Sequence, residues 1–152
     1  MGWHRACGKE FAVVEVIIHR TLFVEVCSVK ILVADDSPTM RRIVVQMLKR
    51  LGYTDISEAD HGKDALDRLR EAGDFELLLT DWNMPVMNGL ELVQTIRADA
   101  TLSALPILMV TTRNQKQDIV TAMREGVNNY ATKPFDPKTI KEKIDKVMAA
   151  VG

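Results

Sequence analysis

Cysteine and histidine are scarce in this 152-residue sequence, and their scarcity excludes several kinds of chemistry. The two cysteines, Cys7 and Cys27, both lie in the first 28 residues, so nothing beyond them suggests a disulfide framework or a CxxC metal site. Of the three histidines only His61 lies beyond that segment, which removes most zinc sites and most His-dependent catalytic arrangements. A chain without a disulfide framework suits a reducing compartment, and we expect a cytoplasmic location.

Long apolar runs and a large excess of one charge are also missing. No apolar run approaches the roughly 18 residues that a membrane-spanning helix needs, so we expect no membrane segment. The net charge of -1 gives no electrostatic reason to expect binding to nucleic acid or to an anionic membrane. The hydrophobic content of 47% and the charged content of 27% are ordinary for a globular protein, and the length suits one domain.

The first 28 residues differ from the rest of the chain. They contain the stretch EFAVVEVIIHRTLFVEVCSV, which is β-branched and apolar and has no helical period. Glu15, Arg20 and Glu25 help to interrupt it too often for the core of a signal peptide. It can be interpreted as an added strand or hairpin, or as upstream sequence translated from a misplaced start. We predict a poorly ordered extension over residues 1–28 and one domain over residues 29–152.

From residue 29 onward, short apolar strands alternate with amphipathic helices. Ser37 offers an N-cap to the first helix, Pro38 suits its first turn, and Gly52 ends it. Unbroken apolar strands between helices predict an α/β fold with a parallel sheet that is covered on both faces. The strands are expected within residues 29–35, 55–59, 75–81, 105–112 and 129–135. The helices are expected from the apolar residues Met40, Ile43, Val44, Met47, Leu48 and Leu51, from the segment 63–71, and from the groups Leu92, Val93, Ile96; Ile119, Ala122, Met123; and Ile140, Ile144, Val147, Met148, Val151.

Polar groups stand at the ends of four of the five predicted strands. In an open parallel sheet, ligands bind beyond the carboxyl ends of the strands, so these groups are candidates for one site. They are Asp35 and Asp36 after the first strand, Asp81 and Asn83 after the third, Thr111 and Thr112 ending the fourth, and Lys133 in the fifth.

This set of groups suits a phosphoryl-transfer site. Three carboxylates at one edge repel one another, and a hard divalent cation such as Mg²⁺ relieves that repulsion. A lysine and a threonine hydroxyl can both hold an anionic oxygen while a phosphoryl group is transferred. A carboxylate can itself be the nucleophile and form an aspartyl phosphate. Asp81 ends the central strand and is the natural acceptor.

Each of these residues also has an ordinary structural explanation. Asp35 and Asp36 before Ser37 could simply cap the first helix, and a threonine at a strand end is usually a good strand former. Tyr130 on a strand is more often a packing residue than a switch. The coincidence of complementary groups at four strand ends favours the functional interpretation.

In these motifs the sequence resembles the receiver domain of two-component response regulators, and in particular the CheY-like chemotaxis regulators. The matching stretches are ADDSPTMRRIV, LLLTDWNMPVMNGLEL, LPILMVTT and NYATKPF, in order and spacing, and the resemblance covers about residues 29–152. It implies a flavodoxin-like (βα)5 doubly wound sheet with strand order 2-1-3-4-5. It also implies a single-domain, monomeric signalling protein that is not an enzyme beyond its own phosphorylation and dephosphorylation, with Mg²⁺ or Mn²⁺ as cofactor.

The resemblance assigns a role to each matching position. It implies that Asp81 is the phosphoacceptor, that Thr111 and Lys133 hold the phosphoryl oxygens, and that Thr111 and Tyr130 form the switch. The metal would be held by Asp35, Asp36, the Asp81 carboxylate and the Asn83 backbone carbonyl. The Lys133–Pro134 peptide bond is expected to be cis.

The output surface and the partners also follow from the resemblance. The face made by the fourth helix, fifth strand and fifth helix should meet the partner, and here it offers Lys116, Ile119, Tyr130, Lys141 and Lys143. The implied partners are a CheA-like histidine kinase, a flagellar motor switch protein and a phosphatase. The lysines could equally be ordinary solvated helix residues.

The sequence departs from the familiar enteric CheY pattern beside the site. Arg113 stands in place of an acidic residue and Thr112 in place of alanine. Both border the path of the water that would hydrolyse the phosphate, so we expect these two residues, together with Asn83, to tune the lifetime of the phosphoryl group.

Three other functions are considered. A haloacid-dehalogenase-like phosphohydrolase would need a second aspartate two residues after the nucleophile, where Asn83 stands. A phosphorylation-independent scaffold would not need all of Asp35, Asp36, Asp81, Thr111 and Lys133. A phosphorelay receiver that passes its phosphate to a histidine phosphotransfer protein remains the alternative to control of the flagellar motor in chemotaxis, which we favour.

Overall fold

The computed structural model describes residues 9–16, 20–27 and 29–150, and in it five parallel strands form one sheet. The strands are β3 (Ile31–Ala34), β4 (Ile56–Ala59), β5 (Leu77–Thr80), β6 (Ile107–Thr111) and β7 (Asn129–Thr132). Their spatial order is β4-β3-β5-β6-β7, so β5 lies at the centre. Counted within the domain, this is the expected order 2-1-3-4-5, which is confirmed.

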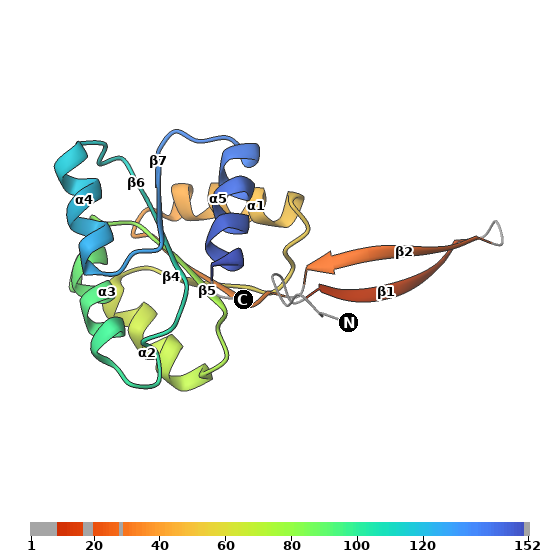
Figure 1. Cartoon of the computed structure of the whole chain (residues 1–152), viewed down its shortest axis with the longest axis horizontal. Helices are drawn as coiled ribbons and strands as arrows, with labels where there is room; N and C mark the ends of the chain where they lie inside the picture. Colours follow the sequence, from red (N-terminus) through yellow and green to blue (C-terminus); the bar gives the residue numbers. More distant parts are fainter. Residues whose placement is uncertain (1–8, 17–19, 28, 151–152) are drawn as a thin grey trace.

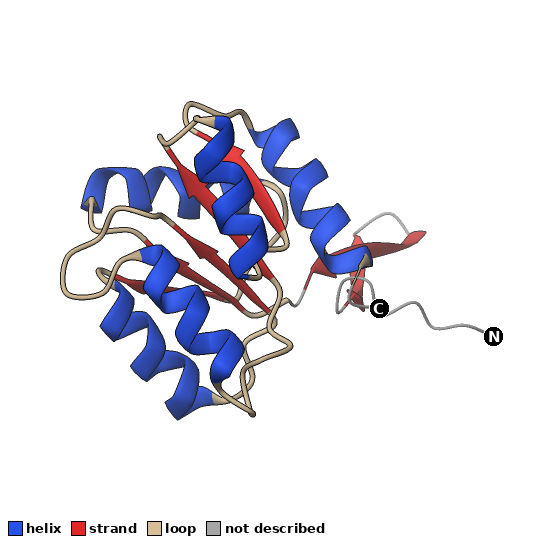
Figure 2. Ribbon diagram, turned by 60° about the vertical axis from the view of Figure 1, so that its left-hand side comes forward, coloured by secondary structure: helices blue, strands red, loops and turns tan. Residues whose placement is uncertain are grey.

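Five helices cover the two faces of this sheet (Figures 1 and 2). They are α1 (Pro38–Arg50), α2 (Gly62–Ala72), α3 (Gly89–Ala98), α4 (Lys116–Glu125) and α5 (Pro137–Ala149). Helices α1 and α5 share one buried cluster with Ile31, Val33, Leu77 and Leu79 of the strands. Helices α2, α3 and α4 share the other cluster with alternating strand residues such as Leu32 and Leu78. Successive side chains of a strand point to opposite faces of the sheet, so each strand contributes residues to both buried clusters.

The start of α1 confirms the predicted capping. The Ser37 side chain accepts a hydrogen bond from the Met40 N–H, and Pro38 occupies the first turn. The predicted apolar face is wrong in one respect, because Ile43 is 38% exposed while Val45 is buried. The helix is rotated so that Arg41 reaches the strand end, where its guanidinium donates to the Asp35 carbonyl oxygen at 2.7 Å.

Helix α4 is less buried than its sequence predicts. Of its described side chains only Ala122 is buried, whereas Met123 is 44% exposed and Val120 is 40% exposed. The predicted fifth helix is confirmed by the burial of Ile140, Ile144, Val147 and Met148. Val151, which was included in its apolar face, lies outside the described residues.

Two further strands precede the domain. The strands β1 (Lys9–Val16) and β2 (Arg20–Cys27) pair antiparallel, with Lys9 opposite Cys27 and Val16 opposite Arg20. They form a sheet of their own, separate from the five-stranded sheet (Figure 1). This is the hairpin that the sequence allowed as an alternative, and the poorly ordered extension over residues 1–28 stays a prediction. Within the described ranges no helix is long and apolar enough to cross a membrane.

Candidate functional site

The carboxyl ends of the strands bring the predicted polar groups to one edge of the sheet. Asp35 and Asp36 follow β3, Asp81 follows β5, Thr111 ends β6 and Lys133 follows β7 directly. Asp35, Asp36 and Asp81 each offer one carboxylate oxygen, and these three oxygens lie within 4.8 Å of one another. We call these three residues the acidic edge.

The Lys133 ammonium group lies between two of these carboxylates. It is 2.7 Å from Asp35 Oδ2 and 3.1 Å from Asp81 Oδ2, and the Lys133 side chain is only 7% exposed. Burial by itself would lower the pKa of Lys133, but the hydrogen bond to Asp35 and the charge of Asp81 outweigh it, so its pKa is raised. Lys133 is therefore a fixed positive charge at the acidic edge. The Lys133–Pro134 peptide bond is cis, as expected.

Backbone groups orient the Asp81 carboxylate. Its Oδ1 accepts hydrogen bonds from the Trp82 N–H at 2.6 Å and from the Asn83 N–H at 3.4 Å. The turn that supplies them is closed by the Gly89 N–H, which donates to the Trp82 carbonyl oxygen at 2.7 Å. The start of α3 thus packs directly against the turn that carries Asp81.

The acidic edge suits a hard divalent cation. Asp35 is 3% exposed; its Oδ1 accepts the Ser37 N–H, while Asp36 is exposed to solvent. Two oriented carboxylates and one accessible carboxylate are oxygen ligands of the kind that Mg²⁺ prefers, and clustering them without a cation is unfavourable. Lys133 offsets only part of that charge. The carboxylates of Asp35, Asp36 and Asp81 therefore fit a Mg²⁺ site.

The threonines at the end of β6 differ in their exposure. Thr111 is fully buried, and its hydroxyl oxygen accepts a 3.4 Å hydrogen bond from the Arg113 N–H. Thr112 is exposed. Only Thr111 therefore belongs to the interior of the sheet edge.

Arg113 makes contacts that the sequence did not reveal. Its Nε donates to Asn83 Oδ1 at 3.1 Å, and its guanidinium lies 4.7 Å from the centre of the Trp82 ring. On its other side it pairs with Asp118 Oδ1 in the first turn of α4, at 3.5 Å. In the sequence, the only sign of this pair is that an acidic residue in the first turn of the helix follows the arginine by five residues, which is a weak signal.

Tyr130 lies on β7, where its side chain is buried and its hydroxyl makes a hydrogen bond. The ring is 6% exposed, and the hydroxyl donates to the Arg113 carbonyl oxygen at 2.7 Å. Burial and the nearby negative charge of Asp118 raise the pKa of Tyr130 to about 12, although the positive charge of Arg113 acts in the opposite direction. The hydroxyl therefore stays protonated to a higher pH than that of an exposed tyrosine.

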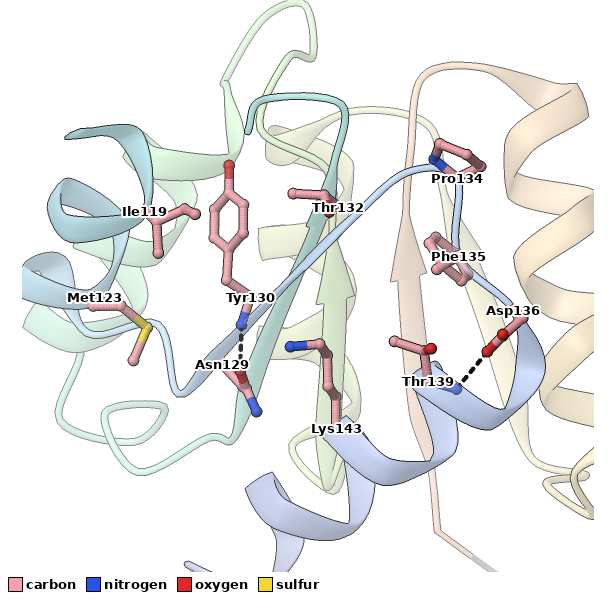
Figure 3. Close-up of a pocket in the computed structure, with 10 residues that line it drawn as sticks. All are labelled: Ile119, Met123, Asn129, Tyr130, Thr132, Pro134, Phe135, Asp136, Thr139 and Lys143. Carbon is pink, nitrogen blue, oxygen red and sulfur yellow. Dashed lines mark hydrogen bonds between the residues drawn. The ribbon is translucent and has the colours of Figure 1, made fainter. Parts of the chain in front are cut away.

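A depression of about 750 Å³ lies between α4, β7 and α5 (Figure 3). We call the surface around it the α4–β7–α5 face. Three of the five predicted partner residues line it, namely Ile119, Tyr130 and Lys143. The described residues that line it do not include Lys116 or Lys141, and the Lys141 ammonium group pairs instead with Asp145 at 2.6 Å. The other lining residues, which were not predicted to meet the partner, are Met123, Asn129, Thr132, Pro134, Phe135, Asp136 and Thr139.

The fold and the acidic edge define a class of protein, and comparison with known proteins agrees. Residues 31–145 match the response regulator receiver domain, and the chain belongs to this family. It is a signalling domain rather than a classical enzyme.

Within the family the chain is CheY-like. It is 50% identical over 119 residues to the chemotaxis protein CheY1 of Helicobacter pylori, covering 78% of this chain and 96% of that protein. It is 52% identical over 119 residues to the CheY homolog of Campylobacter jejuni, covering 78% of this chain and 92% of that protein. Among solved structures, Vibrio cholerae CheY4 is similar, with a TM-score of 0.73, 32% identity and coverage of 79% of this chain and 98% of that one.

Proposed function

We propose that this protein accepts one phosphoryl group from a CheA-like histidine kinase on Asp81, with Mg²⁺ or Mn²⁺, and then changes its α4–β7–α5 face to control a partner. The single observation that supports this most strongly is the convergence of Asp35, Asp36 and Asp81 within 4.8 Å, with Lys133 paired to two of them. A structural ion-pair network has no need of a third, exposed carboxylate.

The transfer is a displacement at phosphorus. A carboxylate oxygen of Asp81 forms a bond to phosphorus while the bond from phosphorus to the kinase histidine nitrogen breaks, and the electron pair of that bond stays on the imidazole. The backbone N–H groups of Trp82 and Asn83 orient the carboxylate. Lys133 and the Thr111 hydroxyl then hold phosphoryl oxygens. A bound Mg²⁺ would neutralise negative charge on the carboxylates and the phosphoryl group.

The response should reach the α4–β7–α5 face through Thr111 and Tyr130. Thr111 ends the strand beside β7, and Tyr130 is bonded to the backbone of Arg113, two residues beyond Thr111. Movement of Thr111 toward a phosphoryl oxygen displaces this segment and so shifts the equilibrium between arrangements of α4 and Tyr130. A partner that binds one arrangement better then responds to phosphorylation.

The partner face combines apolar side chains with one lysine and, nearer the start of α5, the carboxylate of Asp136. Ile119, Met123 and Phe135 line the depression together with Lys143 (Figure 3). This composition suits an amphipathic segment that carries an acidic residue. We assign the role to chemotaxis, with a flagellar motor switch protein as the output partner and a phosphatase as a second one, in a cytoplasmic monomer that binds neither nucleic acid nor membrane.

A fluorescence titration tests the function directly. Trp82 adjoins Asp81, so in full-length protein carrying Trp3→Phe it reports the site alone. We expect a saturable change with Mg²⁺, then a second change and a one-phosphate mass gain with acetyl phosphate. Asp81→Asn should abolish the second change and the mass gain. A chain with no metal response and no mass gain would be a scaffold, and turnover of phosphate esters would indicate a phosphohydrolase.

The output is tested by capture with the activated protein. Phosphorylated wild type should retain a motor switch protein from a lysate of its own source, and Asp81→Asn should not. Retention of a histidine phosphotransfer protein instead would replace motor control with a phosphorelay.

A further inference from the structure

The Arg113 side chain connects the turn that follows Asp81 with α4. Its guanidinium contacts the Trp82 ring and Asn83, one and two residues beyond Asp81, and it also pairs with Asp118. The Arg113 side chain is 40% exposed and that of Asp118 is 25% exposed, so the pair is only partly screened by solvent. The backbone of the same residue accepts the Tyr130 hydroxyl.

The two ends of α4 are held differently. Arg97 fixes the C-terminal end, because its Nε and one terminal nitrogen donate to the Gly126 carbonyl oxygen at 3.0 and 2.7 Å. At the N-terminal end the Gln115 side chain makes no capping hydrogen bond within the described part of the chain. The Arg113–Asp118 pair is therefore a side-chain restraint on the end of α4 that faces the site, in addition to the packing of Ile119 against the core.

The charges make this restraint sensitive to the metal. Arg113 lines the same depression as Asp36, so its guanidinium repels a divalent cation that binds the acidic edge. Asp118 offsets part of that repulsion by drawing the positive charge toward α4. Binding of the cation in turn pushes the guanidinium toward Asp118. The two events are thermodynamically linked and must affect each other equally.

We propose that Arg113 is a positioning residue that couples the Mg²⁺ affinity of the acidic edge to the N-terminal end of α4 through Asp118. This coupling rests on the proposed metal site but needs neither phosphorylation nor the movement of Thr111. It gives the metal-bound, unphosphorylated protein an α4 arrangement different from that of the metal-free protein.

A double-mutant cycle on Mg²⁺ affinity tests the coupling. In full-length protein carrying Trp3→Phe, Trp82 fluorescence gives the Mg²⁺ dissociation constant for the parent, Arg113→Gln, Asp118→Asn and the double variant. We expect Arg113→Gln to tighten binding and Asp118→Asn to weaken it in the parent. In the Arg113→Gln background, the factor by which Asp118→Asn raises the dissociation constant should be about twofold to fivefold smaller than in the parent. This range corresponds to the interaction energy of partly exposed ion pairs. The difference should shrink in high salt.

Matched controls separate coupling from net charge. Arg124→Gln makes the same charge change on an exposed position of α4, and Asp145→Asn makes it on α5. Both should leave the dissociation constant within the error of the parent value. A second readout is amide hydrogen exchange in the first turn of α4, which Mg²⁺ should alter in the parent and not in Arg113→Gln.

The outcomes separate this proposal from the proposed function. The coupling is overturned if the parent binds Mg²⁺ but Asp118→Asn changes the dissociation constant equally in both backgrounds and Mg²⁺ does not alter hydrogen exchange in α4. The proposed metal site is then retained. If the parent shows no saturable response to Mg²⁺, the proposed metal site falls and the coupling falls with it.

Discussion

At the scale of single residues, two cationic side chains, Lys133 and Arg113, set the charge around the acidic edge. Lys133, directly after β7, pairs with Asp35 and Asp81 and offsets part of their charge, whereas the more exposed Arg113 contacts Asn83. Thr112, next to Arg113, is exposed. We expect water that hydrolyses a phosphoryl group on Asp81 to approach from this solvent-exposed side, past Arg113, Thr112 and Asn83.

The phosphoryl lifetime should therefore depend on Arg113 and Thr112. Arg113→Glu replaces the guanidinium with a carboxylate that can accept a proton from water. Thr112→Ala removes side-chain atoms and so gives water better access to the phosphoryl group on Asp81. We expect each to raise the dephosphorylation rate about threefold to tenfold, equivalent to about 0.7 to 1.4 kcal/mol of barrier. Decay of phosphorylated protein after removal of acetyl phosphate measures this. Arg124→Glu is the matched charge reversal and should change nothing; unchanged rates in the two site variants would show that these residues do not set the lifetime.

At the scale of elements, the site depends on how closely α3 approaches the end of β5. Asn88 and Glu91 form a capping box at the start of α3, and Gly89 lies against the backbone of the Asp81 turn. A Cβ at Gly89 would clash with the Asp81 carbonyl oxygen and would lie 2.9 Å from the Trp82 Cα. Because these are backbone atoms, a larger residue cannot be accommodated by a side-chain movement.

Gly89→Ala should therefore destabilise the protein and disturb the metal site together. We expect a loss of about 2 kcal/mol or more in the free energy of unfolding by urea, with weaker Mg²⁺ binding. Gly73→Ala is the control, since its added Cβ has nothing within 4 Å and only its positive φ of 69° opposes the change. It should cost about 1 kcal/mol and leave Mg²⁺ affinity alone. Equal effects on Mg²⁺ binding in the two variants would refute the importance of the close approach.

At the scale of the whole molecule, the domain and the hairpin are separate sheets. The two buried clusters, as far as side chains are described, consist of residues from Val29 onward. The family match likewise covers residues 31–145 and leaves the hairpin outside. All residues to which we assign a role at the acidic edge belong to residues 29–152.

Removal of residues 1–28 should leave the domain intact. A chain that starts at Val29 should keep its thermal midpoint within about 2 °C and its Mg²⁺ affinity within about twofold, because the change in free energy is expected to be below about 0.5 kcal/mol. Scanning calorimetry and the Trp82 titration measure the two quantities. A fall of many degrees would show that the hairpin stabilises the domain. Intact mass of the protein from its native source would show whether the segment is translated at all.

The sequence by itself determined the alternation of strands and helices, the cap at Ser37 and the identity of the groups at the strand ends. These follow from local rules, since burial period, capping and turn chemistry depend on residues close together in the chain. The convergence of Asp35, Asp36 and Asp81 could also be predicted, because parallel strands end at the same edge of the sheet.

Only the tertiary structure decided which face of each helix is buried and which long side chains meet. Ile43 and Met123 fit an apolar period and yet are exposed, because the rotation of α1 and the shallow packing of α4 depend on what lies across the sheet. The bridge from Asn83 through Arg113 to Asp118 joins side chains from three separate segments. The contact between Arg113 and Asn83 joins side chains 30 residues apart, and it leaves no periodic signal in the sequence, so no local rule could have predicted it.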